Sequence, residues 1–232
     1  MDVSEKLQNL PILGTQFRTH ETPDYETDLY RDFLKRAFDI LFALFLLPFI
    51  APVLLLLMAL IKLDSKGPAV FESERVGKDG VKFKCLKLRT MCLGADKKLE
   101  DILKSKTEFQ VEYNKYRKLR NDPRITRVGK FLRSTSLDEV PQVFNVLKGE
   151  MSFVGPRPAL EEEISKYGAL FKEYKSVLPG ITGMWQVSGR NNTCFDERVR
   201  LDVLYRKQLN FMLDLKIIAK TLPVALKRSG AY

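Results

Sequence analysis

The sequence predicts an α/β protein, mostly helical, in which a proline-broken membrane helix joins a small globular domain. An apolar run from Ile40 to Ile61 has no charged or hydrogen-bonding side chain. A helix over this run is about 33 Å long, against a hydrocarbon core of about 30 Å. Apolar residues alternate with lysines from Val81 to Cys85, which is typical of a strand. Much of the remaining chain has helical spacing or a highly charged, helical composition.

The apolar run contains Pro48 and Pro52. Each proline lacks the N–H that would bond the carbonyl four residues earlier, so the helix should bend near its middle. Lys35 and Arg36 precede the run and further lysines follow it, and positive residues mark the cytoplasmic side of a membrane. We therefore predict a re-entrant helix over residues 29–63 that enters and leaves on one side. The alternative is a spanning helix with a proline kink.

The apolar run divides the chain into three parts. Residues 1–28 form a polar segment of mixed charge, in which we expect little order and no signal peptide, because the apolar run starts late and no small-residue cleavage site follows it. The turn residues Asp64 to Pro68 end the helix. One globular domain is expected over residues 64–232.

The globular domain should begin with a β-hairpin. Asp79 and Gly80 form a turn signal before the strand at Val81, and residues 69–72 could be its partner. The highly charged stretch 95–120 predicts one solvated helix. Further helices are expected at 137–147, 159–177, 196–210 and 211–227.

The last of these helices is amphipathic, with an apolar stripe at helical spacing formed by Phe211, Leu215, Ile218 and Leu222. Lysines occupy a neighbouring face. Such a helix can lie at the membrane interface, in the plane of the lipid headgroups. Alternatively, the stripe packs on the core of the domain.

The charge of the chain favours an anionic partner. Lys and Arg outnumber Asp and Glu by 39 to 29, giving a net charge of +10. This charge suits an anionic lipid surface or a phosphorylated ligand. We expect no nucleic-acid partner, because the chain has no zinc-finger spacing, ribonucleoprotein motif or basic zipper.

Cysteine and histidine usage excludes several kinds of site. Cys85, Cys92 and Cys194 are odd in number and form no CxxC pair, which argues against a disulfide framework and a structural zinc site. His20 is the only histidine, and it lies in the polar N-terminal segment. A catalytic triad or a His-rich metal site would depend on this poorly placed residue. Any chemistry must therefore use carboxylates, amines or hydroxyls.

The candidate chemical centre lies at residues 133–142. Ser136 and Glu139 fit a capping box, the structural interpretation of this segment. The functional interpretation rests on Asp138 and Glu139 near Arg133, because phosphoryl transfer uses arginines to hold phosphate oxygens and carboxylates to bind magnesium or attack. Both interpretations stay open at this point.

A second arginine follows within the sequence Gly155-Pro156-Arg157-Pro158. Pro156 and Pro158 should fix the backbone around Arg157, which would add a second guanidinium group to the same region. A rigid turn with a solvated arginine is the alternative.

These segments resemble the bacterial sugar transferases, the monotopic phosphoglycosyl transferases. The resemblance covers residues 34–232, and several features are similar to the catalytic half of the undecaprenyl-phosphate galactose phosphotransferases. The matching segments are residues 35–39, the broken apolar run, 64–68, 87–91, 121–129, 136–142, 155–158, 179–183, 185–190, 198–202 and 230–232.

The resemblance implies a covalent mechanism. Asp138 would be the nucleophile that attacks the β-phosphorus of a UDP-sugar, expels UMP and becomes a phosphosugar ester. Undecaprenyl phosphate would then take the hexose 1-phosphate. Glu139, the second catalytic residue, would bind the Mg²⁺ cofactor. Arg133, Arg157 and Arg89 would bind substrate phosphate. The remaining motif residues that support the match are Pro156, Pro158, Gln142, Gln186 and Arg190.

The resemblance also implies a setting. Galactose is the expected sugar and glucose the second choice, in the first membrane step of surface glycan assembly. The domain should face the cytoplasm at the inner membrane of a bacterium. The expected partners are a UDP-sugar, undecaprenyl phosphate and the membrane, while the choice between monomer and homodimer stays open. A non-catalytic membrane-surface scaffold is the rival interpretation.

Overall fold

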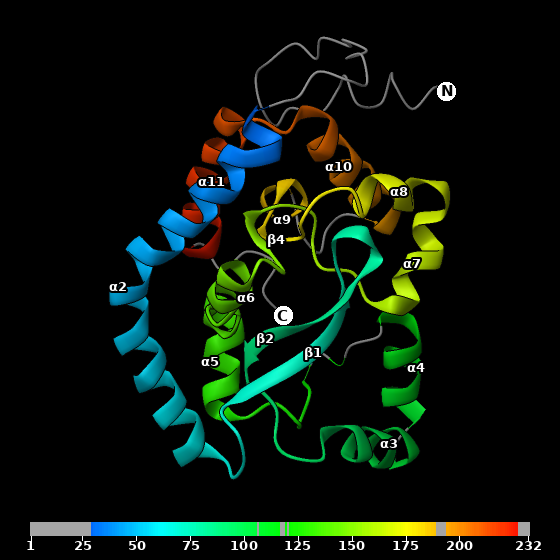
Figure 1. Cartoon of the computed structure of the whole chain (residues 1–232). Coiled ribbons are helices and arrows are strands. Elements are labelled where there is room, and N and C mark those ends of the chain that lie inside the picture. The colour runs from blue at the N-terminus through cyan, green and yellow to red at the C-terminus, as the bar shows by residue number, and fades with distance from the viewer. Residues whose placement is uncertain (1–28, 106, 117–118, 120, 189–193, 227–232) are drawn as a thin grey trace.

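The structure, a computed structural model, describes residues 29–105, 107–116, 119, 121–188 and 194–226 (Figure 1). The predicted segment 1–28 and Arg190 lie outside the described residues. The helices are α2 (Lys35–Asp64), α3 (Ala95–Ser105), α4 (Thr107–Tyr116), α5 (Arg127–Thr135), α6 (Gln142–Lys148), α7 (Glu161–Tyr167), α8 (Phe171–Tyr174), α9 (Met184–Val187), α10 (Phe195–Gln208) and α11 (Phe211–Leu226). The strands are β1 (Val70–Val76), β2 (Lys82–Leu88), β3 (Ser152–Val154) and β4 (Gly180–Thr182). Shorter helical turns are η1 (Tyr30–Leu34), η2 (Lys78–Gly80), η3 (Leu137–Glu139) and η4 (Gly168–Leu170).

The apolar run forms the long helix α2, which continues through Pro48 and Pro52 and bends about halfway along its length (Figure 1). By length and composition it could cross a membrane. In its most apolar 18-residue stretch, only 17% of the residues are buried. The core helix of a soluble protein would be mostly buried. The predicted apolar helix is therefore confirmed. Its path through a membrane stays a prediction.

The two faces of α2 have different surroundings. The face toward the domain buries Ala43, Leu54, Leu57 and Ile61. The opposite face leaves large apolar side chains exposed, namely Leu41, Leu44, Phe45, Phe49, Val53, Leu55, Leu56, Leu60 and Leu63. A continuous apolar surface of this kind indicates contact with lipid or with another protein.

The first turn of α2 is tied to the far end of the chain by a buried carboxylate, Asp214 of α11. Lys35 Nζ lies 2.6 Å from Asp214 Oδ2, and the Tyr30 hydroxyl donates to the same oxygen at 2.6 Å. The Tyr205 hydroxyl donates to Asp214 Oδ1 at 2.8 Å. We call these four residues the Asp214 network. Asp214 is fully buried, so its charge depends on these partners.

Two further residues of the first part of α2 fasten it to the domain. Arg36 donates to the carbonyls of Val146, at 2.6 Å, and Leu147 at the end of α6, where unpaired carbonyls favour a cation. Asp39 Oδ1 accepts hydrogen bonds from the Ser152 hydroxyl and the Phe153 N–H, both at 3.0 Å. The polar residues at the start of α2 therefore bind protein groups and orient the helix.

The predicted hairpin is confirmed, with longer strands than expected. β1 and β2 pair antiparallel, and Ser73 lies opposite Cys85. At the turn, Asp79 and Gly80 have φ values of 57° and 79°, a backbone region that glycine favours. The parallel pair of β3 and β4 was not predicted from the sequence.

Three predicted helices are wrong in their extent. The segment 95–120 forms two helices, α3 and α4, which run in different directions (Figure 1). At the end of α3 the Ser105 hydroxyl donates to the Ile102 carbonyl at 2.7 Å, a side-chain bond that competes with helix continuation. The segment 159–177 is broken at Gly168, which has a φ of 52°. The segment 137–147 is a short turn, η3, followed by α6, with Pro141 at the boundary.

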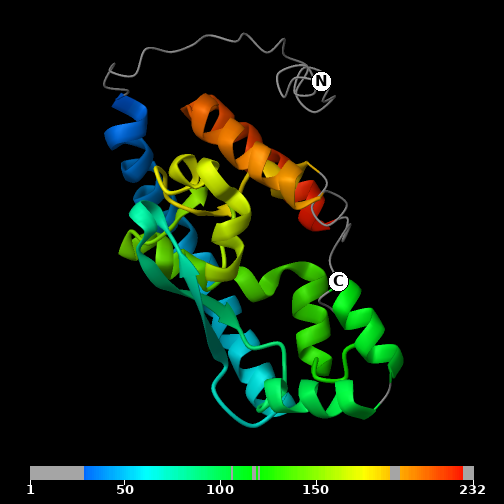
Figure 2. The same ribbon diagram turned by 90° about the vertical axis from the view of Figure 1, so that its right-hand side faces the viewer.

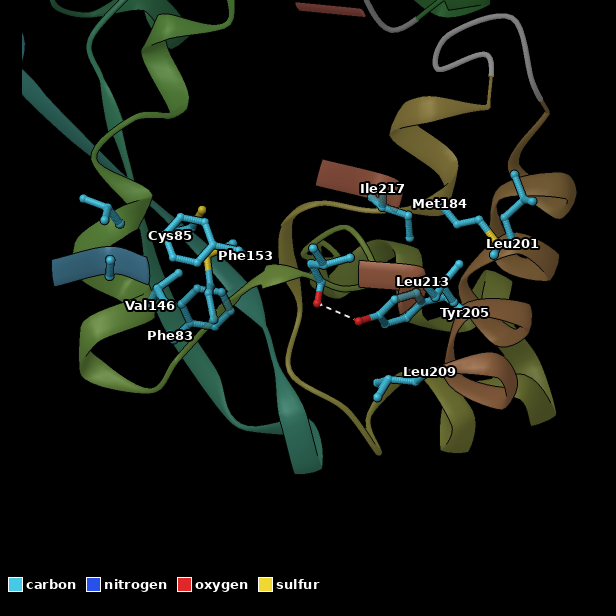
Figure 3. Close-up of a cluster of buried hydrophobic side chains, with 14 residues drawn as sticks. Phe83, Cys85, Val146, Phe153, Met184, Leu201, Tyr205, Leu209, Leu213 and Ile217 are labelled. Carbon is cyan, nitrogen blue, oxygen red and sulfur yellow. Dashed lines mark hydrogen bonds between the residues drawn. The ribbon is translucent and has the colours of Figure 1, made fainter. Parts of the chain in front are cut away.

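The main core joins two halves of the domain (Figure 3). The first group comes from β2, α6 and β3, namely Phe83, Cys85, Val146 and Phe153. The second group comes from α9, α10 and α11, namely Met184, Leu201, Tyr205, Leu209, Leu213 and Ile217. β3 connects the groups, because the Tyr205 hydroxyl donates to the Val154 carbonyl at 2.9 Å.

The helix predicted at 196–210 is confirmed as α10, and the one at 211–227 is confirmed over the described residues as α11, next to it in the chain (Figure 2). Leu213 and Ile217 face the core. Phe211 is 44% exposed and Leu215 is 36% exposed, so the alternative in which the stripe packs on the core is wrong for these two residues, whereas Ile218 of the stripe does pack against the core. Phe211 instead touches the Phe38 ring of α2, so the exposed side of α11 continues the apolar surface of α2.

Candidate active site

A cavity of about 1230 Å³ lies among the hairpin, η3, α9 and the loop that follows β3. Basic side chains outnumber acidic ones in its lining. The basic residues are Arg75, Lys87, Arg89, Arg133, Arg157 and Arg198, and the acidic residues are Asp96, Asp138, Glu139 and Glu163. A concave site with this charge excess suits an anionic ligand.

The backbone between α5 and η3 presents the two adjacent carboxylates. Ser136 has a left-handed conformation, with φ 57°, and its N–H donates to the Arg133 carbonyl at 3.3 Å to end α5. Its side chain makes no capping hydrogen bond, so the capping-box interpretation of Ser136 and Glu139 is wrong. The sharp change of direction at Ser136 brings Asp138 and Glu139 to the cavity.

Asp138 is a half-buried carboxylate with little local support. Among the residues that the structure describes, no side chain donates a hydrogen bond to it. Burial raises the pKa of Asp138 to about 6, and the negative charge of Glu139 adds to this shift, while Lys87 and Arg133 oppose it. A carboxylate that is poorly solvated yet ionised at neutral pH can act as a nucleophile.

Glu139 faces the opposite charges of the cavity wall. Lys87 Nζ donates to Glu139 Oε1 at 2.8 Å, and Arg157 Nη1 lies 3.8 Å from the same oxygen. The side chains of both Glu139 and Lys87 are mostly buried, so this contact is less screened than a surface ion pair. Lys87 therefore links the strand β2 to the acidic pair.

Two of the predicted phosphate-binding arginines flank the acidic pair. Arg133 lies beside Asp138, and its Nε donates to the Thr90 hydroxyl at 2.9 Å. Arg157 lies beside Glu139, with its guanidinium 5.6 Å from the centre of the Trp185 ring. The cation–π contact favours one placement of the Arg157 side chain.

Arg89, the third predicted phosphate ligand, lines the cavity, but its guanidinium group is hydrogen-bonded to the residues that directly follow α2. Its Nη1 donates to the Lys66 carbonyl at 2.8 Å, and its Nη2 donates to the carbonyl and hydroxyl of Ser65. A side chain at Gly67 would meet Arg89 Nη1 at 2.3 Å, so the glycine makes room for this contact. A role of Arg89 in phosphate binding stays a prediction.

The remaining motif residues either accept hydrogen bonds through their backbone carbonyls or are buried within the domain. The Pro156 carbonyl accepts from Gly180 N–H at 2.8 Å, and Pro158 O accepts from Arg75. Gln186 is buried at the cavity, whereas Gln142 is buried at the start of α6 and does not line it.

The acidic pair fits a magnesium ion that arrives with a phosphorylated substrate. Within the described part of the chain, no group of three or more His, Cys, Asp and Glu side chains could hold a metal alone. Magnesium commonly takes one or two carboxylates, completes its shell with water and substrate phosphates, and neutralises phosphate charge. Glu139, together with the adjacent Asp138, supplies ligands of that kind. The expected metal role of Glu139 stays a prediction.

Sequence reasoning gave no role to four residues of this cavity. Three of them lie in segments that carry the family resemblance, which is the signal that could have identified them, namely Lys87, Trp185 and Arg198. Arg75 had no such signal, because a charged residue in a strand usually indicates a solvated face.

Several known proteins are similar to this chain in sequence. Residues 30–228 match the family model described as bacterial sugar transferase. A UDP-galactose-lipid carrier transferase of Erwinia amylovora is 46% identical over 200 residues, and an undecaprenyl-phosphate galactose phosphotransferase of Salmonella typhimurium is 44% identical over 200 residues. Each alignment covers 86% of this chain and 42% of the relative.

A relative of similar length also matches. The exopolysaccharide production protein ExoY of Sinorhizobium fredii is 42% identical over 198 residues, which cover 85% of this chain and 88% of ExoY. The chain therefore spans about two fifths of the two longer relatives and aligns with most of the shorter one.

Proposed function

The chain belongs to the bacterial sugar transferase family, and from this premise we propose that it is a phosphoglycosyl transferase. It transfers hexose 1-phosphate from a UDP-sugar to undecaprenyl phosphate, with UMP as the other product. Galactose is the favoured sugar, because relatives that carry galactose in their names are 44–46% identical. Glucose is the second choice.

One observation carries the proposal: Asp138 and Glu139 share a cation-lined cavity that extends to α2 and α11, the two helices that carry the exposed apolar surface. Ile50 of α2 and Thr221 of α11 both line this cavity. A lipid-linked phosphate held at a membrane interface can therefore reach the same space as a soluble nucleotide donor. A scaffold that only binds lipid would have no need for this acidic pair.

The first half-reaction uses Asp138 as nucleophile. A carboxylate oxygen of Asp138 forms a bond to the β-phosphorus of the donor, and the bond from that phosphorus to the bridging oxygen breaks. UMP leaves with the bridging oxygen and its electron pair. Arg133 acts on Asp138 and Arg157 lies beside Glu139, so that their charges can stabilise the phosphate oxygens of the donor.

The second half-reaction reverses the roles. A phosphate oxygen of undecaprenyl phosphate attacks the same phosphorus, and the Asp138 carboxylate leaves. Magnesium, when bound by Glu139 and substrate phosphate, supplies additional positive charge. The covalent ester divides one transfer into two steps, each with a phosphate or carboxylate leaving group.

The nucleophile is tested by Asp138→Asn. We expect UMP release from UDP-galactose to fall by about 10³-fold or more, because the amide is a poor nucleophile. Asp96→Asn is the matched control, since Asp96 also lines the cavity but belongs to α3, outside the acidic pair. Peptide mass spectrometry of the wild type, incubated with donor alone, should find the phosphohexose on Asp138. Normal UMP release by Asp138→Asn would refute the mechanism and favour the scaffold.

The proposed location is the inner membrane of a bacterium, with the domain in the cytoplasm and α2 as a re-entrant helix. We test it with a cysteine introduced at Thr15 and an impermeant thiol reagent applied to intact cells. The expected result is no labelling until the cells are lysed. Exposed Cys194 of the domain is an internal control for lysis. Labelling of position 15 in intact cells, with Cys194 protected, would show that α2 spans the membrane.

A further inference from the structure

Arg75 is a cation of the cavity wall that lies outside every motif used above. It lies on β1 opposite Phe83 of β2, next but one to Ser73, and strand alternation places Arg75 and Ser73 on the same face of the hairpin. Both residues line the cavity. The strand register therefore directs the half-buried guanidinium group of Arg75 toward the space in front of the acidic pair.

The charge of Arg75 is poorly compensated. Its hydrogen bond within the described part of the chain is a long one of 3.4 Å, from Nη1 to the Pro158 carbonyl, and no described carboxylate forms an ion pair with it. The nearby Glu163 is used elsewhere: it accepts from Arg198 at 3.1 Å and from the Leu160 N–H at 2.9 Å. Arg75 thus differs from Lys87 and Arg198 of the same wall, which are paired with carboxylates.

A second guanidinium group increases this imbalance. Burial and the neighbouring charge of Arg157 lower the pKa of Arg75. Arg157 in turn touches Glu139 only at 3.8 Å and keeps 31% of its side chain exposed. Two half-buried cations that repel each other are stabilised by an anion between them, and guanidinium forks match phosphate oxygens.

We propose that Arg75 and Arg157 together bind the phosphate that stays with the nucleotide when Asp138 takes the sugar phosphate. This inference rests on the proposed function. The attacked phosphorus must lie against Asp138, where the positive charges that act on the carboxylate are those of Lys87 and Arg133. The other phosphate of the donor lies farther from the nucleophile, since attacking and leaving oxygens are roughly in line. Arg157 lies beside Glu139, and Arg75 lies beside Arg157.

Binding of UMP to the full chain tests this assignment, with the fluorescence of Trp185 as the readout. Trp185 is the only tryptophan of the chain, and the Arg157 guanidinium lies over its ring. We expect Arg75→Gln to weaken UMP binding by about 10- to 100-fold, the effect of losing a charge-assisted contact, and Arg75→Lys to weaken it less. Uridine, which has no phosphate, should bind wild type and Arg75→Gln equally.

Arg206→Gln is the matched control. Arg206 is an arginine of α10 that pairs with Glu173 and does not line the cavity, so its loss should leave UMP binding unchanged. Equal UMP affinities of the wild type and Arg75→Gln would overturn the assignment. If the wild type shows no response to UMP, the proposed nucleotide donor fails as well, so the two failures are distinguishable.

A second measurement needs no variant and remains decisive if Arg75→Gln does not fold. The wild type is treated with an arginine-specific dicarbonyl reagent, and the modified peptides are weighed. We expect saturating UMP to slow modification of Arg75 and Arg157 by about tenfold, while Arg206 reacts at the same rate and uridine gives no protection. Modification of Arg75 at an unchanged rate under saturating UMP would refute the proposal.

Discussion

Asp214 and Asp138 are two carboxylates of one domain with opposite surroundings. Asp214 is fully buried and accepts from Tyr30, Lys35 and Tyr205 at 2.6 to 2.8 Å. Asp138 is half-buried, and no described side chain donates to it. The fold therefore compensates the charge of Asp214, whereas it leaves Asp138, the proposed nucleophile, without a described side-chain donor.

The two carboxylates differ in the number of hydrogen bonds that each receives from side chains. A buried ion that is hydrogen-bonded on both oxygens is a poor nucleophile, because its electron pairs are already engaged. An ion with few partners is destabilised, which the pKa of Asp138, raised to about 6, expresses directly. Local instability at a site of this kind is typical of residues that react.

The largest expected effect comes from breaking the satisfied side of the comparison. Asp214→Ala leaves the buried Lys35 ammonium and two tyrosine hydroxyls without their acceptor, so we expect the free energy of unfolding to fall by about 3–5 kcal/mol. Denaturant unfolding in one detergent measures this loss. Asp196→Ala, at an exposed acid of α10, should cost about 1 kcal/mol or less. A similar small loss at Asp214 would contradict the structural role of the network.

A smaller effect of opposite sign is expected at Asp138, the proposed nucleophile. The pKa of Asp138 in the folded protein is raised above its usual value, so ionisation of Asp138 favours the unfolded chain. The resulting loss of folding stability is fully present above about pH 6 and absent below about pH 4. Asp138→Asn should therefore stabilise the protein by about 1–3 kcal/mol at pH 7.5. Thermal unfolding at pH 7.5 and at pH 4 provides the measurement. A variant less stable than the wild type at pH 7.5 would show that the charge is well compensated.

The smallest effect concerns the pH dependence of UMP release. Asp138, the proposed nucleophile, loses its charged form as the pH falls through about 6, so the rate of UMP release should decrease about tenfold per pH unit below that value. Lys87 opposes the raised pKa, so Lys87→Met should move this acidic limb to higher pH by about half a unit to one unit. Lys84→Met, on the same strand but paired with exposed Glu72, should not move it. If the acidic limb of Lys87→Met stays in place, Lys87 does not influence the pKa of Asp138.

Local patterns predicted the parts of the fold that depend on neighbouring residues. The apolar run predicted α2. The alternation of apolar residues and lysines after Asp79 and Gly80 predicted the hairpin, because both signals are formed by residues close together in the sequence. The pair of β3 and β4 was missed, since each strand has three residues and their contact depends on the close approach of Gly155 and Gly180. Breaks inside helices were missed where single side chains such as Ser105 compete with the backbone.

The candidate site was predictable to a similar degree. Asp138 and Glu139 are adjacent in the sequence, and Arg133 and Arg157 lie close enough to attract attention, so their grouping followed from spacing. Arg75 could not be found in this way, because only the register of the hairpin brings it to the cavity. The partners of Arg89 were equally unpredictable, because the turn at Gly67 decides where the Ser65 and Lys66 carbonyls lie.

The Asp214 network has a consequence for biosynthesis. Lys35 and Asp214 are 179 positions apart, so the ribosome makes the lysine long before its acceptor. At about 5–20 residues per second, the interval is on the order of 10–40 s. During that time the nascent apolar helix can enter the bilayer, but its first turn cannot dock. Synthesis of Asp214 therefore precedes the docking of the first turn of α2 on the domain.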